Sequence, residues 1–454
     1  MNTHRRMLWP GAVVGAAVLM AGACSGSAGG SERTGAGDCV HVVDEETGRT
    51  GKDCLPLAPE SQRVDLAEPT FTHPTRITNP LHPTSEVDQV VMGGQVDDEA
   101  FRTEVSLLPG TKTIEFDGRT VQALTQQYVA FADGRIQEVA LDWYAQADDG
   151  SVWYLGEDVF NYEDGVVADT EGTWQAGRDD APAAMIMPAQ PEKGDVYRPE
   201  NLPGVVFEEV TVQEVDRTVD GPYGKVKGAI TVRELHMDGS TEDKTFAPGY
   251  GEFSTGNDGG DLEAVSLAVP TDAQQGPLPG ELGELDRAAQ AAQDGQVTEA
   301  DLGAVQDAWT AYRDSDAVPE LLHAQMTRDL DTLDEAASAK DEEKMQGAAL
   351  RVAQNTSDLR LRHEPVRTVD LDRFDLWARQ LGIDARAGDE GAVAGDVTSL
   401  ELVWERLKGE APRAEAAAVT ADLRAAREAA DRKDMTAAGQ LAPSLVEEIA
   451  ALTR

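Results

Sequence analysis

The sequence predicts an α+β protein in which an antiparallel β domain precedes an α-helical domain. Asp-Gly dipeptides recur at near-regular intervals between residues 117 and 165, with alternating apolar residues between them. Composition then changes sharply across residues 271–280, where Gly, Pro and Gln are frequent. Beyond this segment Ala, Leu and charged residues dominate. We therefore expect a β domain over residues 61–270, a linker over 271–280 and a helical domain over 281–454.

The first 23 residues have the three parts of an export signal. Arg5 and Arg6 precede an apolar run over residues 11–20, which small residues follow. The run is shorter than the ~20 residues that cross a bilayer. The end of this segment, Met-Ala-Gly-Ala-Cys24, resembles the bacterial lipobox. The resemblance implies cleavage before Cys24, acylation of that cysteine, and a lipoprotein bound to the lipid bilayer on the extracytoplasmic face of the cell membrane.

Two alternatives stay open for this segment. Under the first, Cys24 is an ordinary cysteine behind the signal of a soluble secreted protein. Under the second, Arg5 and Arg6 belong to a twin-arginine signal, which the segment also resembles in part. The sequence does not decide between the general and the twin-arginine export route.

Residues 24–60 are expected to form a flexible tether followed by a small disulfide loop. The Ser- and Gly-rich stretch directly after Cys24 is typical of a flexible linker. Cys39 and Cys54 are the only other cysteines, and an even pair in an oxidising compartment favours a disulfide. Two short strands are expected between them. Metal binding by the two thiols is the alternative.

The chain is strongly acidic, with 83 Asp and Glu residues against 39 Lys and Arg residues and a net charge of −44. Such a chain repels the phosphates of nucleic acids and the headgroups of anionic lipids. Nucleic acid is therefore excluded as a partner.

The predicted β domain is a meander of long strands. Asp-Gly dipeptides begin at residues 117, 133, 149 and 164. Asp-Gly favours the type I′ hairpin turn, in which both central residues have positive φ. The spacing leaves strands of ~13 residues, longer than the usual five or six. A sheet of such strands is expected to be strongly curved or to form a half-barrel.

The predicted helical domain is a bundle of stacked helical hairpins. Residues 333–350 and 423–441 share a pattern in which an Ala-rich helix, a Lys-Asp break and a second helix follow one another. Such a repeat is typical of helical hairpins. Thr298 followed by Asp301 predicts a capping box at the start of another helix.

Residues 142–158, which read DWYAQADDGSVWYLGED, resemble a signature of uncharacterised bacterial secreted proteins and lipoproteins. Glu171–Trp174, residues 185–188 and residues 246–251 are similar to further parts of that signature, so the resemblance covers roughly residues 75–270. It implies no particular activity. The segment 247–251 is also similar to a strand ending in half-barrel lipoproteins that carry lipids.

Asp142 and Glu157 are the main candidates for a site. A two-residue turn at Asp149-Gly150 places them directly opposite one another, and the next turn places Glu157 opposite Gly172. Opposed carboxylates repel one another. A bound cation, a basic group or a shared proton would compensate for this repulsion. Asp142 and Glu157 are therefore also the candidates for binding a metal ion.

Aromatic residues are expected in the same row as the two carboxylates. They are Tyr144, Trp153 and Trp174. Together with Asp142 and Glu157 they form a candidate ligand-binding site, because aromatic walls with a few polar groups are typical of ligand pockets. Core packing under a curved sheet is the alternative for the aromatic side chains.

The sequence favours a ligand- or partner-binding protein of the cell envelope over an enzyme. It contains no Gly-x-Ser-x-Gly, phosphate-binding loop or dinucleotide fingerprint, and no two histidines at helical metal-binding spacing after the signal. No particular cofactor, small ligand or envelope partner is predicted. The alternative is a carboxylate-based hydrolase or a metal-binding protein. Asp142 and Glu157 would carry the hydrolytic chemistry.

Overall fold

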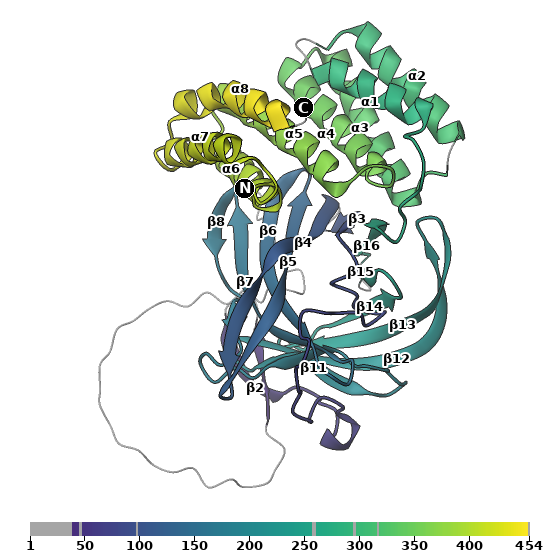
Figure 1. Ribbon diagram of the computed structural model, residues 1–454, viewed down its shortest axis with the longest axis vertical. Coiled ribbons are helices and arrows are strands. Elements are labelled where there is room, and N and C mark those ends of the chain that lie inside the picture. Colours follow the sequence, from purple (N-terminus) through teal and green to yellow (C-terminus); the bar gives the residue numbers. More distant parts are fainter. Residues whose placement is uncertain are drawn as a thin grey trace.

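The structure is a computed structural model that describes residues 39–44, 48–96, 99–256, 260–293, 297–315 and 317–452. A large antiparallel sheet precedes eight helices in these residues, which confirms the predicted α+β class (Figure 1). The expected signal peptide, Cys24 and the tether lie outside the described residues. None of the described helices is long and apolar enough to cross a membrane.

The strands occupy the chain from residue 41 to residue 269. They are β1 (His41–Asp44), β2 (Arg49–Cys54), β3 (Gln89–Val96), β4 (Glu99–Phe116), β5 (Arg119–Ala132), β6 (Arg135–Gln146), β7 (Val152–Glu163), β8 (Val166–Asp169), β9 (Trp174–Gln175), β10 (Ala184–Met187), β11 (Val196–Leu202), β12 (Val206–Gly221), β13 (Gly224–His236), β14 (Thr241–Ala247), β15 (Gly251–Gly256) and β16 (Leu262–Val269).

The helices follow in the C-terminal part of the chain. They are α1 (Gly280–Gln293), α2 (Glu299–Ser315), α3 (Glu320–Ala339), α4 (Glu342–Arg360), α5 (Val366–Ala387), α6 (Glu390–Leu407), α7 (Arg413–Asp431) and α8 (Met435–Leu452). The capping box predicted before α2 is confirmed, because the Thr298 N–H donates to Asp301 and the Asp301 N–H donates to the Thr298 hydroxyl.

Fourteen strands form one antiparallel sheet that does not close into a barrel. The path along the sheet runs β10-β7-β6-β5-β4-β3-β16-β15-β14-β13-β12-β11, and β8 and β9 also pair with β7. The strands between the four Asp-Gly dipeptides are β5, β6 and β7, with 14, 12 and 12 residues, close to the predicted length. Figure 1 shows the sheet bending from the strands under the helices to the transverse strands β11–β13.

Three of the four Asp-Gly dipeptides form the predicted hairpin turns. Both residues have positive φ at 117–118, 133–134 and 164–165, as a type I′ turn requires. The prediction for Asp149-Gly150 is wrong. Five residues separate β6 from β7, and only Gly150 of this dipeptide has positive φ. Asp149 instead accepts hydrogen bonds from the N–H and the hydroxyl of Ser151, which stabilises a wider loop.

The predicted disulfide between Cys39 and Cys54 is present, with Cα atoms 5.3 Å apart. It joins the small β1–β2 sheet, which lies apart from the large one. Val40 and Leu55 of this unit are buried against Phe207 and Met237, so the disulfide loop is attached to the β12–β13 edge of the large sheet.

The two Lys-Asp breaks predicted in the helical part have the same local structure. Lys340 and Lys433 both have positive φ, and Asp341 and Asp434 accept hydrogen bonds from N–H groups in the first turn of the next helix. Each break therefore ends one helix and caps the next. Helix α3 packs on α4 across the first break, and α7 packs on α8 across the second.

Helices α3 and α6 contact the sheet on β3, β4, β6, β8 and β16. The apolar part of this interface includes Val129, Phe131, Phe374 and Trp377, with the rings of Phe131 and Trp377 stacked at 5.3 Å. Because neighbouring residues of a strand point to opposite faces, the alternate residues of β3–β6 point away from the helices. The helices thus cover one face of β3–β6 and leave the other face to the interior of the curve.

A buried network of six charged side chains also joins the sheet to the helices. Its members are Arg102 and Glu104 from β4, Asp358 from α4, Asp370 and Arg373 from α5, and Arg406 from α6. Asp358 accepts from Arg102 at 2.7 Å and from Arg373 at 2.8 Å. Burial alone would raise the pKa of Glu104, but the three arginines hold it well below its usual value. The network has three positive and three negative charges, so it is balanced.

The backbone of the β7–β8 turn is in direct contact with the backbone at the start of α6. A Cβ atom on Gly165 would lie 1.9 Å from the carbonyl oxygen of Gly391, and one on Gly391 would lie 2.0 Å from that of Asp164. Neither position can carry a side chain without moving the turn away from the helix.

We predict that Arg373→Met lowers the free energy of unfolding by about 3–5 kcal/mol, because it leaves buried carboxylates without their partner. Lys225→Met is the matched control, since the Lys225–Asp220 pair is exposed on both sides. Its loss should stay below ~1 kcal/mol. Urea unfolding followed by circular dichroism measures both values, and equal losses would contradict a structural role for the network.

Candidate functional site

A cavity of about 180 Å³ lies on the face of the sheet that the helices leave uncovered. Strands from both ends of the sheet contribute to it, so the curvature brings together residues far apart in the sequence. The residues that matter for its chemistry are His82, Tyr128, Glu138, Asp142, Tyr144, Tyr154, Glu157, Glu200, Glu208, Lys244, Tyr250, Glu252 and Glu263.

Asp142 and Glu157 lie side by side in this cavity, as predicted. They are a directly opposed pair of β6 and β7, and both are buried. The predicted pairing is correct although the turn that motivated it is wrong. The wider loop shifts the pairing by one residue, so that Tyr144 pairs with Tyr154. An irregularity between Asp142 and Tyr144 then shifts the pairing back by one residue. The two shifts cancel, and Asp142 is opposite Glu157 as in a regular hairpin.

The predicted partner of Glu157 on its other side is wrong. Glu157 pairs with Trp174 of β9, not with Gly172. The approach of β9 depends on Gly156, which has a φ of 123°. A Cβ atom at this position would lie 2.4 Å from the carbonyl oxygen of Trp174. Any side chain at Gly156 would therefore displace the strand that carries Trp174.

Tyrosines surround the two carboxylates. The Tyr154 hydroxyl donates to Asp142 at 2.7 Å, and its ring stacks on that of Tyr144 at 4.8 Å. The edge of Tyr144 meets His82 at 4.6 Å, and Trp174 packs against Tyr154 at 5.4 Å. The expected aromatic row thus exists around Asp142, but its members are not all those that the sequence suggested.

Trp153 does not line the cavity. It pairs with Ala145 and donates from its indole N–H to Ser151, on the opposite face of β7 from Tyr154. Trp174 is buried behind Tyr154 and is also absent from the lining residues. Of the five predicted binding residues, the structure places Asp142, Tyr144 and Glu157 on the cavity surface.

Burial raises the pKa values of the two opposed carboxyl groups. Burial raises the pKa of Asp142 to about 7, against the hydrogen bond from Tyr154. Burial also raises the pKa of Glu157 well above its usual value, assisted by the charges of Glu200 and Asp142. A side-chain hydrogen bond also joins Glu157 to Glu200, and burial raises the pKa of Glu200 to about 8.

Five further cavity carboxyls were not identified from the sequence. They are Glu138, Glu200, Glu208, Glu252 and Glu263. Burial raises the pKa of Glu138 and of Glu263 to about 8. One signal was available: Glu208 interrupts an otherwise apolar stripe of Val206, Val210 and Val212 on one face of β12. A carboxylate within such a stripe indicates a polar interior.

Basic groups are few at the cavity. Lys244 forms ion pairs with Glu234 at 2.9 Å and with Glu252 at 3.7 Å. His82 shares a hydrogen bond with Thr84, and burial lowers the pKa of this histidine to about 4, so it is neutral at pH 7. Seven of the lining residues carry a carboxyl group, and Lys244 is the one lysine among them.

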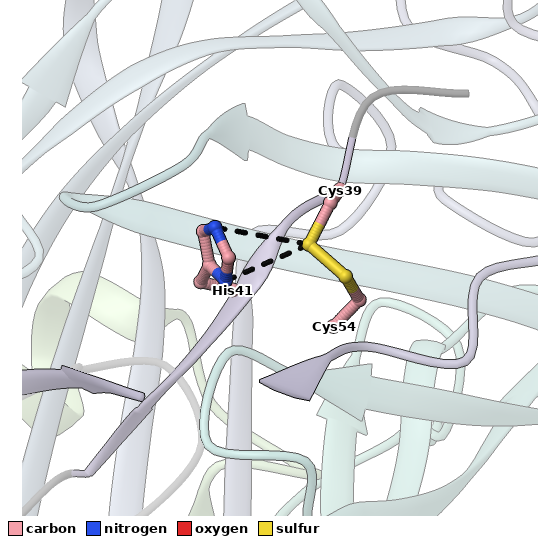
Figure 2. A group of neighbouring side chains, drawn as sticks. All are labelled: Cys39, His41 and Cys54. Atoms are coloured by element: carbon pink, nitrogen blue, oxygen red, sulfur yellow. Dashed lines mark hydrogen bonds between the residues drawn. A yellow bond between two sulfur atoms is a disulfide. The ribbon is translucent and has the colours of Figure 1, made fainter. Parts of the chain in front are cut away.

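A second group of metal-ligand residue types lies at the disulfide and does not line the cavity. Figure 2 shows Cys39, Cys54 and His41 together, with the His41 Nδ1 atom 3.5 Å from the Cys39 sulfur. The two sulfurs are bonded to one another. They are therefore not thiolates, and the oxidised group lacks the ligand form that a metal requires.

Comparison of the chain with protein-family models, with curated proteins and with solved structures gives no match in any of the three. The chemistry of the cavity is therefore the basis for a functional assignment.

We predict that Asp142→Asn stabilises the protein increasingly as the pH rises. The pKa of Asp142 is about 7 in the folded state, against 3.8 for an ordinary aspartate. The folded state therefore holds more protons than the unfolded state between about pH 4 and pH 7, and its stability falls with pH in this window. The amide of the variant can still accept a hydrogen bond from Tyr154. Its free energy of unfolding relative to the wild type should be roughly 2–4 kcal/mol higher at pH 8 than at pH 4.

Urea unfolding at pH 4, 6 and 8 tests this expectation. Asp158→Asn is the control, because Asp158 follows Glu157 directly on β7 but its side chain is 42% exposed. A gain for Asp142→Asn that does not depend on pH would show that Asp142 is ionised throughout.

Proposed function

We propose that the chain is an exported, lipid-anchored protein that binds a small cationic ligand in the cavity of its curved β-sheet. The observation that carries this proposal is the excess of carboxyl groups in the cavity wall, where seven of them and one lysine line the cavity. Buried carboxylates without partners are costly, and a cation in the cavity would stabilise their ionised forms.

The remaining wall favours an organic cation over a fully hydrated ion. Tyr128, Tyr144, Tyr154 and Tyr250 offer aromatic faces, which attract ammonium groups. Val90, Met92, Phe246 and other apolar residues also line the cavity and would contact the uncharged part of such a ligand. Apolar walls with a few convergent polar groups are typical of small-molecule sites.

A hydrolase that uses Asp142 and Glu157 is the second candidate. One ionised and one protonated carboxyl is the arrangement of retaining glycosidases, and Asp142 and Glu157 are two opposed carboxyl groups whose pKa values burial raises. However, opposed residues of neighbouring strands point the same way, which leaves no space for a sugar between them. The cavity of about 180 Å³ also suits a small molecule better than a segment of a polymer. Binding is therefore the better-supported function.

We predict that an ammonium compound such as choline raises the melting temperature of the purified protein, whereas its neutral isostere 3,3-dimethylbutan-1-ol does not. Asp142→Asn combined with Glu157→Gln should weaken binding at least about tenfold, or ~1.4 kcal/mol, because it removes the two opposed carboxyls. Thermal shifts and isothermal titration calorimetry give the measurement, with methylamine and spermidine as smaller and larger probes.

Asp158→Asn serves again as the control and should bind like the wild type. Native mass spectrometry of the untreated protein reports any ligand that copurifies. A copurified anion, or failure of every amine to bind, would refute the proposed ligand class.

The proposed anchor depends on Cys24. We predict that Cys24→Ala releases the protein from the membrane fraction into the medium, because acyl chains provide the hydrophobic anchoring energy. Cell fractionation and immunoblotting measure the distribution. The double variant Cys39→Ala, Cys54→Ala is the control, since it removes the disulfide and should keep the anchor. Unchanged membrane association of Cys24→Ala would contradict acylation as the anchor.

A further inference from the structure

We infer that Glu208, Glu234 and His236 form a binding site for one divalent transition-metal ion, with Zn²⁺ as the best fit. The site lies in the wall of the sheet formed by β12 and β13. Glu208 also lines the cavity, but the site shares no residue with the Asp142–Glu157 pair, so variants of that pair distinguish it from the proposed ligand site.

The fold places the three side chains on one face. Glu208 of β12 is directly opposite His236 of β13, and Glu234 precedes His236 by two residues on the same strand. Residues two apart on a strand share a face. All three are buried, with relative exposures of 7% for Glu208, 2% for Glu234 and 5% for His236.

The distances match those of metal ligands. One potential ligand atom from each residue lies within 4.8 Å of the others. The Nδ1 atom of His236 is 3.4 Å from the nearer Glu208 oxygen, which is long for a charge-assisted hydrogen bond. Two ligand atoms at ~2.1 Å from a tetrahedral zinc ion are about 3.4 Å apart. Ligand atoms that lie within 4.8 Å of one another therefore need to approach by at most about 1.4 Å to bind one ion.

Unpartnered polar atoms provide independent support. Among the described residues, the Nε2 atom of His236 is buried without a hydrogen-bond partner. The same is true of an oxygen of Glu242, which is directly opposite Glu234 on β14 and is also buried. Buried polar groups are rarely left without partners in proteins, so these atoms indicate that something is bound in their neighbourhood.

The local charge also favours a dication. Glu208, Glu234, Glu242 and Glu252 surround a single ammonium group, that of Lys244, which bridges Glu234 and Glu252. A metal ligand must be deprotonated, and once His236 has lost its proton this wall has four carboxyl groups against one ammonium group. Lys244 contacts one oxygen of Glu234 at 2.9 Å and so leaves the other oxygen for the metal.

A histidine nitrogen with two carboxylate oxygens suits Zn²⁺ and related first-row ions, whereas Mg²⁺ and Ca²⁺ prefer oxygen ligands alone. Three protein ligands leave the fourth tetrahedral position open. Because Glu208 also lines the cavity, the open position would be reached from that side.

The test is a zinc titration of the purified protein after treatment with a chelator. We expect one Zn²⁺ per chain by calorimetry and by elemental analysis, and a higher melting temperature with Zn²⁺ than with Mg²⁺ or Ca²⁺. His236→Gln and Glu234→Gln should each weaken zinc binding more than ~100-fold, since removing even a supporting residue costs 10- to 100-fold.

Two controls separate this site from the others. His41→Gln should bind zinc like the wild type, because His41 lies beside the disulfide and not at the sheet. Asp142→Asn should also keep full zinc affinity while it loses affinity for amines. If the wild-type protein binds zinc but no amine, that result would count against the proposed ligand site alone.

Co²⁺ provides a test on the wild-type protein alone, so it does not require that any variant folds. The wild-type protein loaded with Co²⁺ should show the intense visible bands of a tetrahedral site, and Zn²⁺ should abolish them. No zinc binding by the wild type, or zinc binding that survives both His236→Gln and Glu234→Gln, would overturn the inference and leave His236 and Glu208 as an ion pair.

Discussion

The buried network of three arginines and three carboxylates is the interaction on which the architecture depends. It connects β4 to α4, α5 and α6, so each ion pair ties the sheet to a different helix. Such a network is stable only while all of its members are present, because each one lost leaves a buried charge without compensation. The sheet and the helices are therefore expected to unfold together. The helices in turn cover one face of β3–β6 with apolar side chains, which leaves the other face to form the cavity.

The two faces of the sheet differ in how their buried carboxyl groups are paired. On the helix side, arginines match the carboxylates, and the pKa of Glu104 is well below its usual value. On the cavity side, carboxyls such as Glu138 and Glu263 have few positive partners, and burial raises their pKa values to about 8. Paired charges on the helix side stabilise the contact between sheet and helices. Carboxyl groups without basic partners on the cavity side could instead form ion pairs with a bound ligand. This contrast within one sheet is the strongest indication of where function resides.

Local patterns predicted local structure well. The Asp-Gly turns with two positive φ values, the disulfide and the Lys-Asp helix breaks depend on residues close in sequence. The face on which Trp153 lies could not be predicted, because a five-residue loop shifts the β6–β7 register by one position and reverses which side chains point inward. Glu200 and Glu208 reach the cavity only because the sheet curves, and curvature is a tertiary property. The pairing of Asp142 with Glu157 was predicted through two errors that cancelled, a two-residue turn and an unbroken ladder.

The raised pKa values on the cavity face would link the proposed binding of a cation to the pH of the surrounding solution. Glu138 and Glu263 hold protons at neutral pH because of burial. A cation bound as proposed would displace some of those protons, so its binding would acidify the solution and acid would release it. The cavity would then exchange one kind of positive charge for another, and its loading would follow the pH.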